Sequence, residues 1–64
     1  MTGDEVIEST LVFVLRNADG SDDPWLRGYG IGQIDLAVWH LDADQERATA
    51  ARGEIQRLTR RSEA

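Results

Sequence analysis

The chain combines a very short length with a complete lack of cysteine. Its 64 residues cannot be held by a disulfide or by a thiolate metal site. A chain of this size buries only about 60% of the surface that its unfolded form exposes, so its stability is marginal. Tight packing and association with another chain are the remaining stabilising devices. The sequence therefore predicts a single small domain, residues 1–64, that is completed by homo-oligomerisation.

The net charge of the chain excludes some classes of binding partner. The formal net charge of −5 argues against nucleic acid, because a phosphate backbone requires a basic surface. Residues 1–44 hold nine acids and two arginines, whereas residues 45–64 hold three acids and five arginines. All seven basic residues are arginine, a usage typical of a GC-rich genome, and we expect a source such as a phage or an actinobacterium.

The distribution of apolar residues argues against a membrane protein. The longest purely apolar run is Leu11 to Leu15, far short of the roughly 20 residues that span a bilayer. Acids near the N-terminus, Asp4 and Glu5, stand where a signal peptide would need basic residues. The lack of cysteine fits a reducing compartment. We therefore expect a cytoplasmic protein with no membrane partner.

A two-residue apolar period near the N-terminus predicts a strand. Residues of one parity are apolar except Ser9, namely Ile7, Leu11, Phe13 and Leu15. The β-branched and aromatic residues of 10–14 support this interpretation. Residues 17–24 then predict a loop, because nearly every one of them is a turn former.

The segment 25–41 allows two interpretations. As a strand, it places Gly28, Gly30 and Gly32 on the same face as the apolar residues that follow them. As a helix, residues 31–41 form an apolar stripe that continues toward the C-terminus. We favour the strand, because the glycines open the segment and Asp44 would interrupt the helical stripe.

Residues 42–61 predict a helix. Asp42 is the expected N-cap, with Gln45 completing a capping box. Its expected apolar stripe consists of Ala48, Ala51, Ile55 and Leu58. The predicted fold class is therefore α+β: a two-stranded antiparallel hairpin followed by a C-terminal amphipathic helix.

Three patterns contain residue types that are found in metal, nucleotide-binding or catalytic sites, but none of the three predicts such a site. Oxygen ligands alternate through Asn17, Asp19, Ser21 and Asp23, but the glycine of a calcium loop is misplaced. The alternating glycines lack the spacing of a dinucleotide-binding loop and the lysine of a P-loop. His40 lies near acids but has no nucleophile in a recognised context. We predict no catalytic residue, no cofactor and no metal.

The aromatic residues Trp25, Tyr29 and Trp39 are the most informative side chains. They either form the core or include an exposed anchor for a partner, and we favour the core. If one is an anchor, the candidate surface is the acidic loop and the residues directly after it. The predicted partner-binding residues are Asp19, Asp22, Asp23, Trp25, Arg27 and Tyr29.

One local resemblance concerns the segment Phe13 to Gly20 together with Trp25. It resembles the opening strand and turn of the MbtH-like accessory proteins of nonribosomal peptide synthesis, over about 13 of the 64 residues. The resemblance implies a small, cytoplasmic, non-enzymatic partner of adenylation domains. The chain departs from that pattern at Asp23, Pro24 and Leu26, and it lacks the later Pro-x-Gly-Trp segment.

Together these observations predict a non-enzymatic protein–protein interaction module. Its expected role is to regulate or inhibit a larger protein. The alternatives are a structural or assembly subunit of the virion type and an MbtH-like accessory protein. An enzyme is disfavoured, because a catalytic cleft is hard to build in 64 residues.

Overall fold

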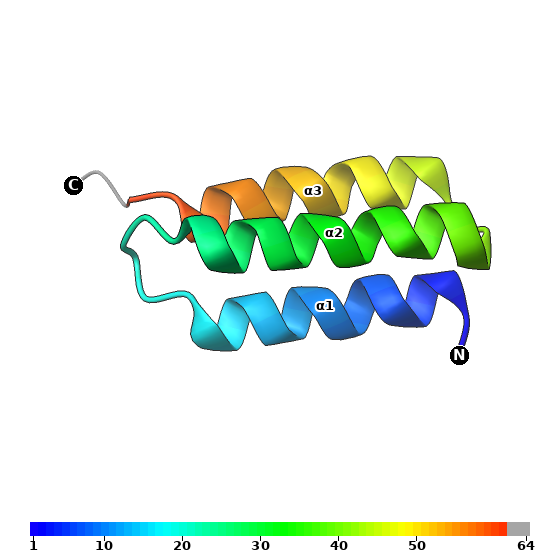
Figure 1. Ribbon diagram of the computed structural model, residues 1–64, viewed down its shortest axis with the longest axis horizontal. Coiled ribbons are helices and arrows are strands. Elements are labelled where there is room, and N and C mark those ends of the chain that lie inside the picture. The colour runs from blue at the N-terminus through cyan, green and yellow to red at the C-terminus, as the bar shows by residue number, and fades with distance from the viewer. Residues whose placement is uncertain (62–64) are drawn as a thin grey trace.

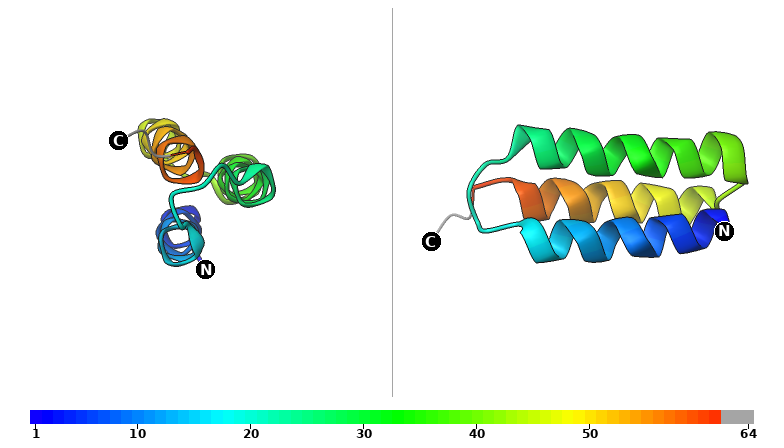
Figure 2. Two further views of the ribbon diagram at one scale, coloured as in Figure 1. Left: turned by 90° about the vertical axis from the view of Figure 1, so that its left-hand side faces the viewer. Right: turned by 60° about the horizontal axis from the view of Figure 1, so that its bottom comes forward.

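The computed structural model describes residues 1–61 and contains three helices there: α1 (Gly3–Asn17), α2 (Pro24–Leu41) and α3 (Gln45–Thr59). Figure 1 shows the chain running along the bundle in α1, back in α2 and forward again in α3. Seen end-on, the three helices lie at the corners of a triangle (Figure 2). Each helix contacts both others. The described residues contain no strand.

The predicted α+β hairpin is therefore wrong, because the residues that were expected to form its first strand belong to α1. The buried residues of α1 are Gly3, Ile7, Thr10 and Val14, which repeat every three or four residues. Because residues 6–15 are mostly apolar at both parities, they fit a strand period and a helix period equally well. The signal that favours the helix over the strand is the capping box at the start of the segment. Thr2 accepts a hydrogen bond from the Glu5 N–H, and Glu5 accepts one from the Thr2 N–H, which forms a capping box.

The second predicted strand is also wrong, and the alternative helical interpretation of this segment is confirmed. Asp23 is the N-cap of α2, accepting a hydrogen bond from the Leu26 N–H at 3.0 Å, and Pro24 begins the helix. The glycines do not line one strand face. Gly30 is buried where an added Cβ would lie 3.0 Å from Val14 and 3.1 Å from Ile55.

The C-terminal helix is confirmed over Gln45–Thr59, but its predicted start is wrong. Asp44, not Asp42, is the N-cap and accepts a hydrogen bond from the Arg47 N–H. Asp42 ends α2 with a φ of 51°, in the left-handed region. This C-cap ends α2 before Asp44 is reached. Asp44 therefore does not interrupt the apolar stripe of that helix, as had been expected.

The core is narrow, and four of its nine buried apolar residues are alanines. Its buried apolar members are Ile7, Val14, Leu26, Ile34, Ala37, Ala43, Ala48, Ala51 and Ile55. The alanines and Gly30 let the helices approach closely, so few large side chains fit between them. Large apolar residues of α1 and α2 are consequently left outside. Within residues 1–61, no helix has the length and apolar character needed to cross a membrane.

Candidate interaction surface

One face of the bundle, where α1 and α2 lie side by side, exposes large apolar side chains. We call it the aromatic face, and it consists of Phe13, Trp25, Tyr29, Gly32, Leu36 and Trp39. Trp25 and Trp39 are each 71% exposed, Leu36 is 45% exposed, and Tyr29 is 41% exposed. The expectation that the three large rings form the core is therefore wrong. Exposed large apolar side chains on one helix face make this surface a candidate interaction site.

The rings of the aromatic face are held against one another. The Phe13 and Tyr29 ring centroids lie 5.1 Å apart with the planes tilted by 52°. Trp25 stacks on Tyr29, with centroids 5.7 Å apart and an interplanar angle of 8°. Tyr29 thus contacts a ring of α1 and a ring of its own helix. Such contacts fix the rings before any partner arrives.

A groove runs beside these rings, between α1 and α2. It has a volume of about 310 Å³, and its lining residues are Met1, Val6, Ser9, Thr10, Phe13, Tyr29 and Gln33. Not one of these side chains is charged. At the base of the groove, the Thr10 hydroxyl donates to the Val6 carbonyl at 2.7 Å, so its polar atom is satisfied within its own helix. The groove therefore suits an apolar side chain rather than an ion.

The charged residues of α2 point away from this face. Arg27 Nη1 donates to Asp22 at 2.9 Å and to the carbonyl of Thr59, at the end of α3, at 3.2 Å. Asp35 accepts two hydrogen bonds from Arg52 of α3. Both charged side chains of α2 are thus directed toward α3, and the side that adjoins α1 is left uncharged.

The spacing of apolar residues in α2 explains the surface. The buried residues Leu26, Gly30, Ile34 and Ala37 form one stripe. A second stripe follows steps of four, three, four and three through Trp25, Tyr29, Gly32, Leu36 and Trp39. Because only the first stripe packs inside the bundle, the second stripe is largely left exposed by the other described helices. By contrast, α3 places arginine, glutamate and glutamine on its outer face.

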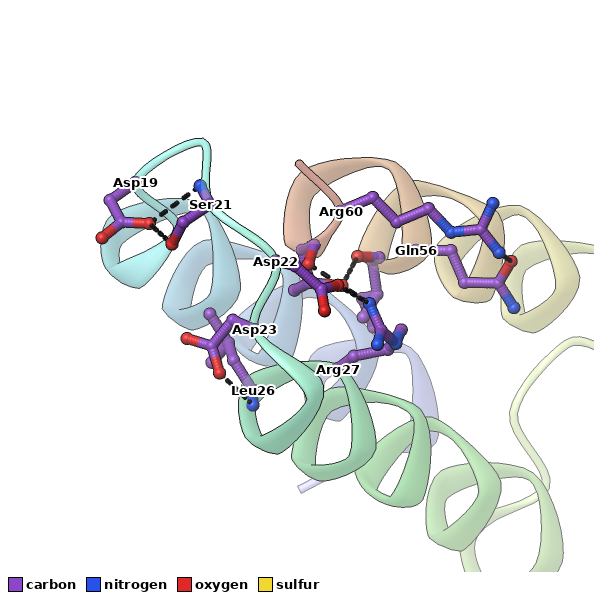
Figure 3. Close-up of polar contacts among 10 residues, drawn as sticks. Asp19, Ser21, Asp22, Asp23, Leu26, Arg27, Gln56 and Arg60 are labelled. Carbon is purple, nitrogen blue, oxygen red and sulfur yellow. Dashed lines mark hydrogen bonds and ion pairs between the residues drawn. The ribbon is translucent and has the colours of Figure 1, made fainter. Parts of the chain in front are cut away.

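The acidic loop, which was predicted to bind a partner, is engaged in contacts within the chain (Figure 3). Asp19 accepts hydrogen bonds from the hydroxyl and the N–H of Ser21, and these lower the pKa of its carboxyl below the usual value. Asp22 pairs with Arg27, and Asp23 caps α2. The Asp23 N–H also donates to the Thr59 carbonyl at 2.8 Å. These contacts join the start of α2 to the end of α3.

The structure divides the six predicted partner-binding residues into two groups. Trp25 and Tyr29 lie together on the aromatic face, whereas Arg27 lies on the α3 side of α2 with the loop acids. Phe13, Leu36 and Trp39 belong to the aromatic face but were missing from the predicted set. The heptad spacing of α2 is the sequence signal that would have found Leu36 and Trp39.

The titratable groups of the described chain form no obvious reaction centre. Within residues 1–61, no cluster of three or more histidine and acidic side chains has the geometry to hold a metal ion. His40 lies in the last turn of α2 and is exposed. The segment that resembles the MbtH-like opening strand is helical through Asn17. Comparison with protein-family models, with curated proteins and with solved structures finds no match.

Proposed function

We propose that this protein is a non-enzymatic interaction module that acts in the cytoplasm, associates with itself and regulates a larger protein through the aromatic face. The observation that carries the proposal is the set of exposed, packed rings of Phe13, Trp25 and Tyr29 beside a groove that is lined by no charged side chain. The lack of cysteine fits the reducing compartment.

The chemistry of the face favours a protein partner. Tryptophan and tyrosine are enriched among the residues that dominate binding energy, particularly when they are already ordered. The groove between Val6, Thr10 and Gln33 can receive one apolar side chain of the partner. The exposed acids Asp19 and Asp22 lie in the loop just before α2, where their negative field steers a partner with a basic rim.

The test is affinity capture from the native cell, using variants that obstruct the groove. Ser9→Arg places a long charged side chain at the groove, while Thr49→Arg adds the same charge at an exposed position of α3. A protein captured by the wild type and by Thr49→Arg, but lost with Ser9→Arg, supports the proposal. Equal capture by all three contradicts the use of the groove.

Trp25→Ala tests the ring cluster separately. Because the side chain is 71% exposed, its removal should lower the free energy of unfolding by less than about 0.5 kcal/mol. Affinity for the captured protein should fall by about 2 kcal/mol or more, as expected for an anchor. A variant that melts much earlier but binds normally would show that Trp25 serves the fold instead.

A further inference from the structure

We infer that two copies of the chain associate through α2, in an antiparallel pair whose two-fold axis passes beside Gly32. This inference rests on the proposed function, in that it takes the aromatic face to be a protein-binding surface. It adds the identity of one partner and the register of the contact. Because the pair covers Trp25, the larger protein then contacts Phe13 and the groove beside α1, and the effect of Trp25→Ala on its capture passes through the dimer.

The register follows from the positions of the large side chains along the stripe. Trp25 and Trp39 are both seven residues from Gly32, one before it and one after it. In an antiparallel helix pair centred on Gly32, Trp25 of one copy therefore faces Trp39 of the other. Both rings lie about 10 Å from the axis along the helix, and both are largely exposed. The pairing occurs twice, as a two-fold interface requires.

The same register matches a large side chain with an open position. Gly28 and Leu36 are each four residues from Gly32, so Leu36 of one copy faces Gly28 of the other. A Cβ added at Gly28 or at Gly32 would meet nothing within 4 Å, which shows that both positions are open. Leu36 can thus enter the space over Gly28, and the two helices can approach closely at Gly32. This arrangement is a knob-into-hole contact.

Charge favours this face for a second copy. The chain has a net charge of −5, so two copies repel each other wherever their acids meet. The stripe carries no charged residue, and Arg27 and Asp35 are paired toward α3. Heptad-spaced apolar residues on an uncharged helix face are the pattern that pairs helices.

The available area corresponds to a weak dimer that forms at high concentration. With 150–250 Å² for each aromatic side chain, the exposed parts of Trp25, Tyr29, Leu36 and Trp39 amount to about 500 Å² per copy. A stable interface buries about 800 Å² per partner. The backbone at the two open glycines and the polar rim of the stripe, including Gln33 and His40, supply additional contact area.

The first test compares two glycine variants by sedimentation equilibrium at high micromolar concentration. Gly32→Glu places a carboxylate at the axis, while Gly53→Glu adds the same charge at an exposed, open glycine of α3. The wild type and Gly53→Glu should sediment as twice the 7.1 kDa chain, and Gly32→Glu as a monomer. Gly32→Ala, which favours the helix, should still weaken the dimer about tenfold by separating the two backbones.

The second test determines the register by disulfide formation, since the natural chain has no cysteine. Mixed G28C and L36C chains should form a disulfide between the two variants much faster than either variant forms one with itself. Faster self-linking of each variant would indicate a parallel pair and overturn the register. A monomeric wild type, or dimers equally stable in both glutamate variants, would overturn the inference as a whole. Neither result affects the Ser9→Arg capture experiment, so the binding of a larger protein can stand or fail independently of self-association.

Discussion

The carboxylate of Asp35 on α2 accepts two hydrogen bonds from the guanidinium of Arg52 on α3. Nε lies 2.9 Å and Nη2 lies 2.7 Å from the same oxygen, Oδ1. Both side chains are 30% exposed. The pair therefore lies at the boundary between solvent and core, where it ties the two helices together and keeps the charge of Asp35 on the α3 side of the bundle.

This ion pair should contribute measurably to stability. A double-mutant cycle of Asp35→Ala and Arg52→Ala should give a coupling free energy of about 0.5–1 kcal/mol from denaturant unfolding at fixed chain concentration. The more exposed pair of Asp4 and Arg47, with 3.8 Å between charged atoms, is the matched control and should show almost no coupling. Equal coupling energies in the two cycles would contradict the role assigned to Asp35.

Substitution of Gly30 should lower the free energy of unfolding, although Gly30 lies within a helix. Gly30→Ala places a Cβ 3.0 Å from Val14 and 3.1 Å from Ile55, and both neighbours are fully buried. Overpacking should cost about 1–3 kcal/mol. After a gain of about 1 kcal/mol in helix propensity, we expect the free energy of unfolding to fall by up to about 2 kcal/mol. Gly53→Ala, in open space on α3, should instead raise it. Two variants of equal stability would show that the core can expand at Gly30.

The fold was only partly predictable because two patterns coexist in the first 41 residues. In α1, Ile7 and Leu11 satisfy a two-residue period as well as a helical one, so apolar spacing could not decide between them. In α2, exposed apolar residues obscure the buried stripe. The helix α3 was predictable because its outer face is polar. The helix starts are indicated instead by capping residues, namely Thr2 with Glu5 for α1 and Asp23 with Pro24 for α2.

Only those residues of the candidate site that lie close together in the sequence could be predicted. Trp25 and Tyr29 are four residues apart and were found together, but their contact with Phe13 depends on how α1 packs against α2. Arg27 was included because it is adjacent in sequence, although helix geometry turns it toward α3. A helical interpretation of residues 24–41 would have separated these two faces. The packing of α1 against them is a tertiary property.

The capping box of α1 should make stability depend on acid pH. The hydrogen bond that the Thr2 N–H donates to the Glu5 carboxylate, together with the Thr2 hydroxyl, holds the pKa of this carboxyl below its usual value of 4.5. A lowered pKa in the folded state means that the ionised cap stabilises the fold above pH 4.5. This stabilisation disappears as pH falls through the folded-state pKa. Carbon-detected NMR titration should give a pKa below 4.5 for Glu5, and Thr2→Val should raise it toward that value.

Glu5→Gln separates the charge from the hydrogen bond, because glutamine also completes a capping box. The variant should keep most of its stability at neutral pH and should lose the part of the acid dependence that belongs to Glu5. A stability profile between pH 3 and pH 5 that matches the wild type would show that Glu5 titrates equally in both states.

The contact between Arg27 and Thr59 should matter more than the ion pair that Arg27 makes with Asp22. Arg27 Nη1 and the Asp23 N–H both donate to the Thr59 carbonyl, so the negative end of α3 is held at the positive start of α2. Asp22, in contrast, is 56% exposed, and its pair with Arg27 is screened by solvent.

Arg27→Met keeps the apolar stem but removes every donor, whereas Asp22→Asn removes only the charge of the ion pair. We expect Arg27→Met to lower the free energy of unfolding by about 1–2 kcal/mol, since a carbonyl loses a charged donor. Asp22→Asn should cost less than about 0.5 kcal/mol. Amide exchange should reveal the same difference locally, with faster exchange at the Asp23 N–H in Arg27→Met alone. Equal losses in the two variants would mean that the ion pair, and not the link to α3, accounts for the stabilising effect of Arg27.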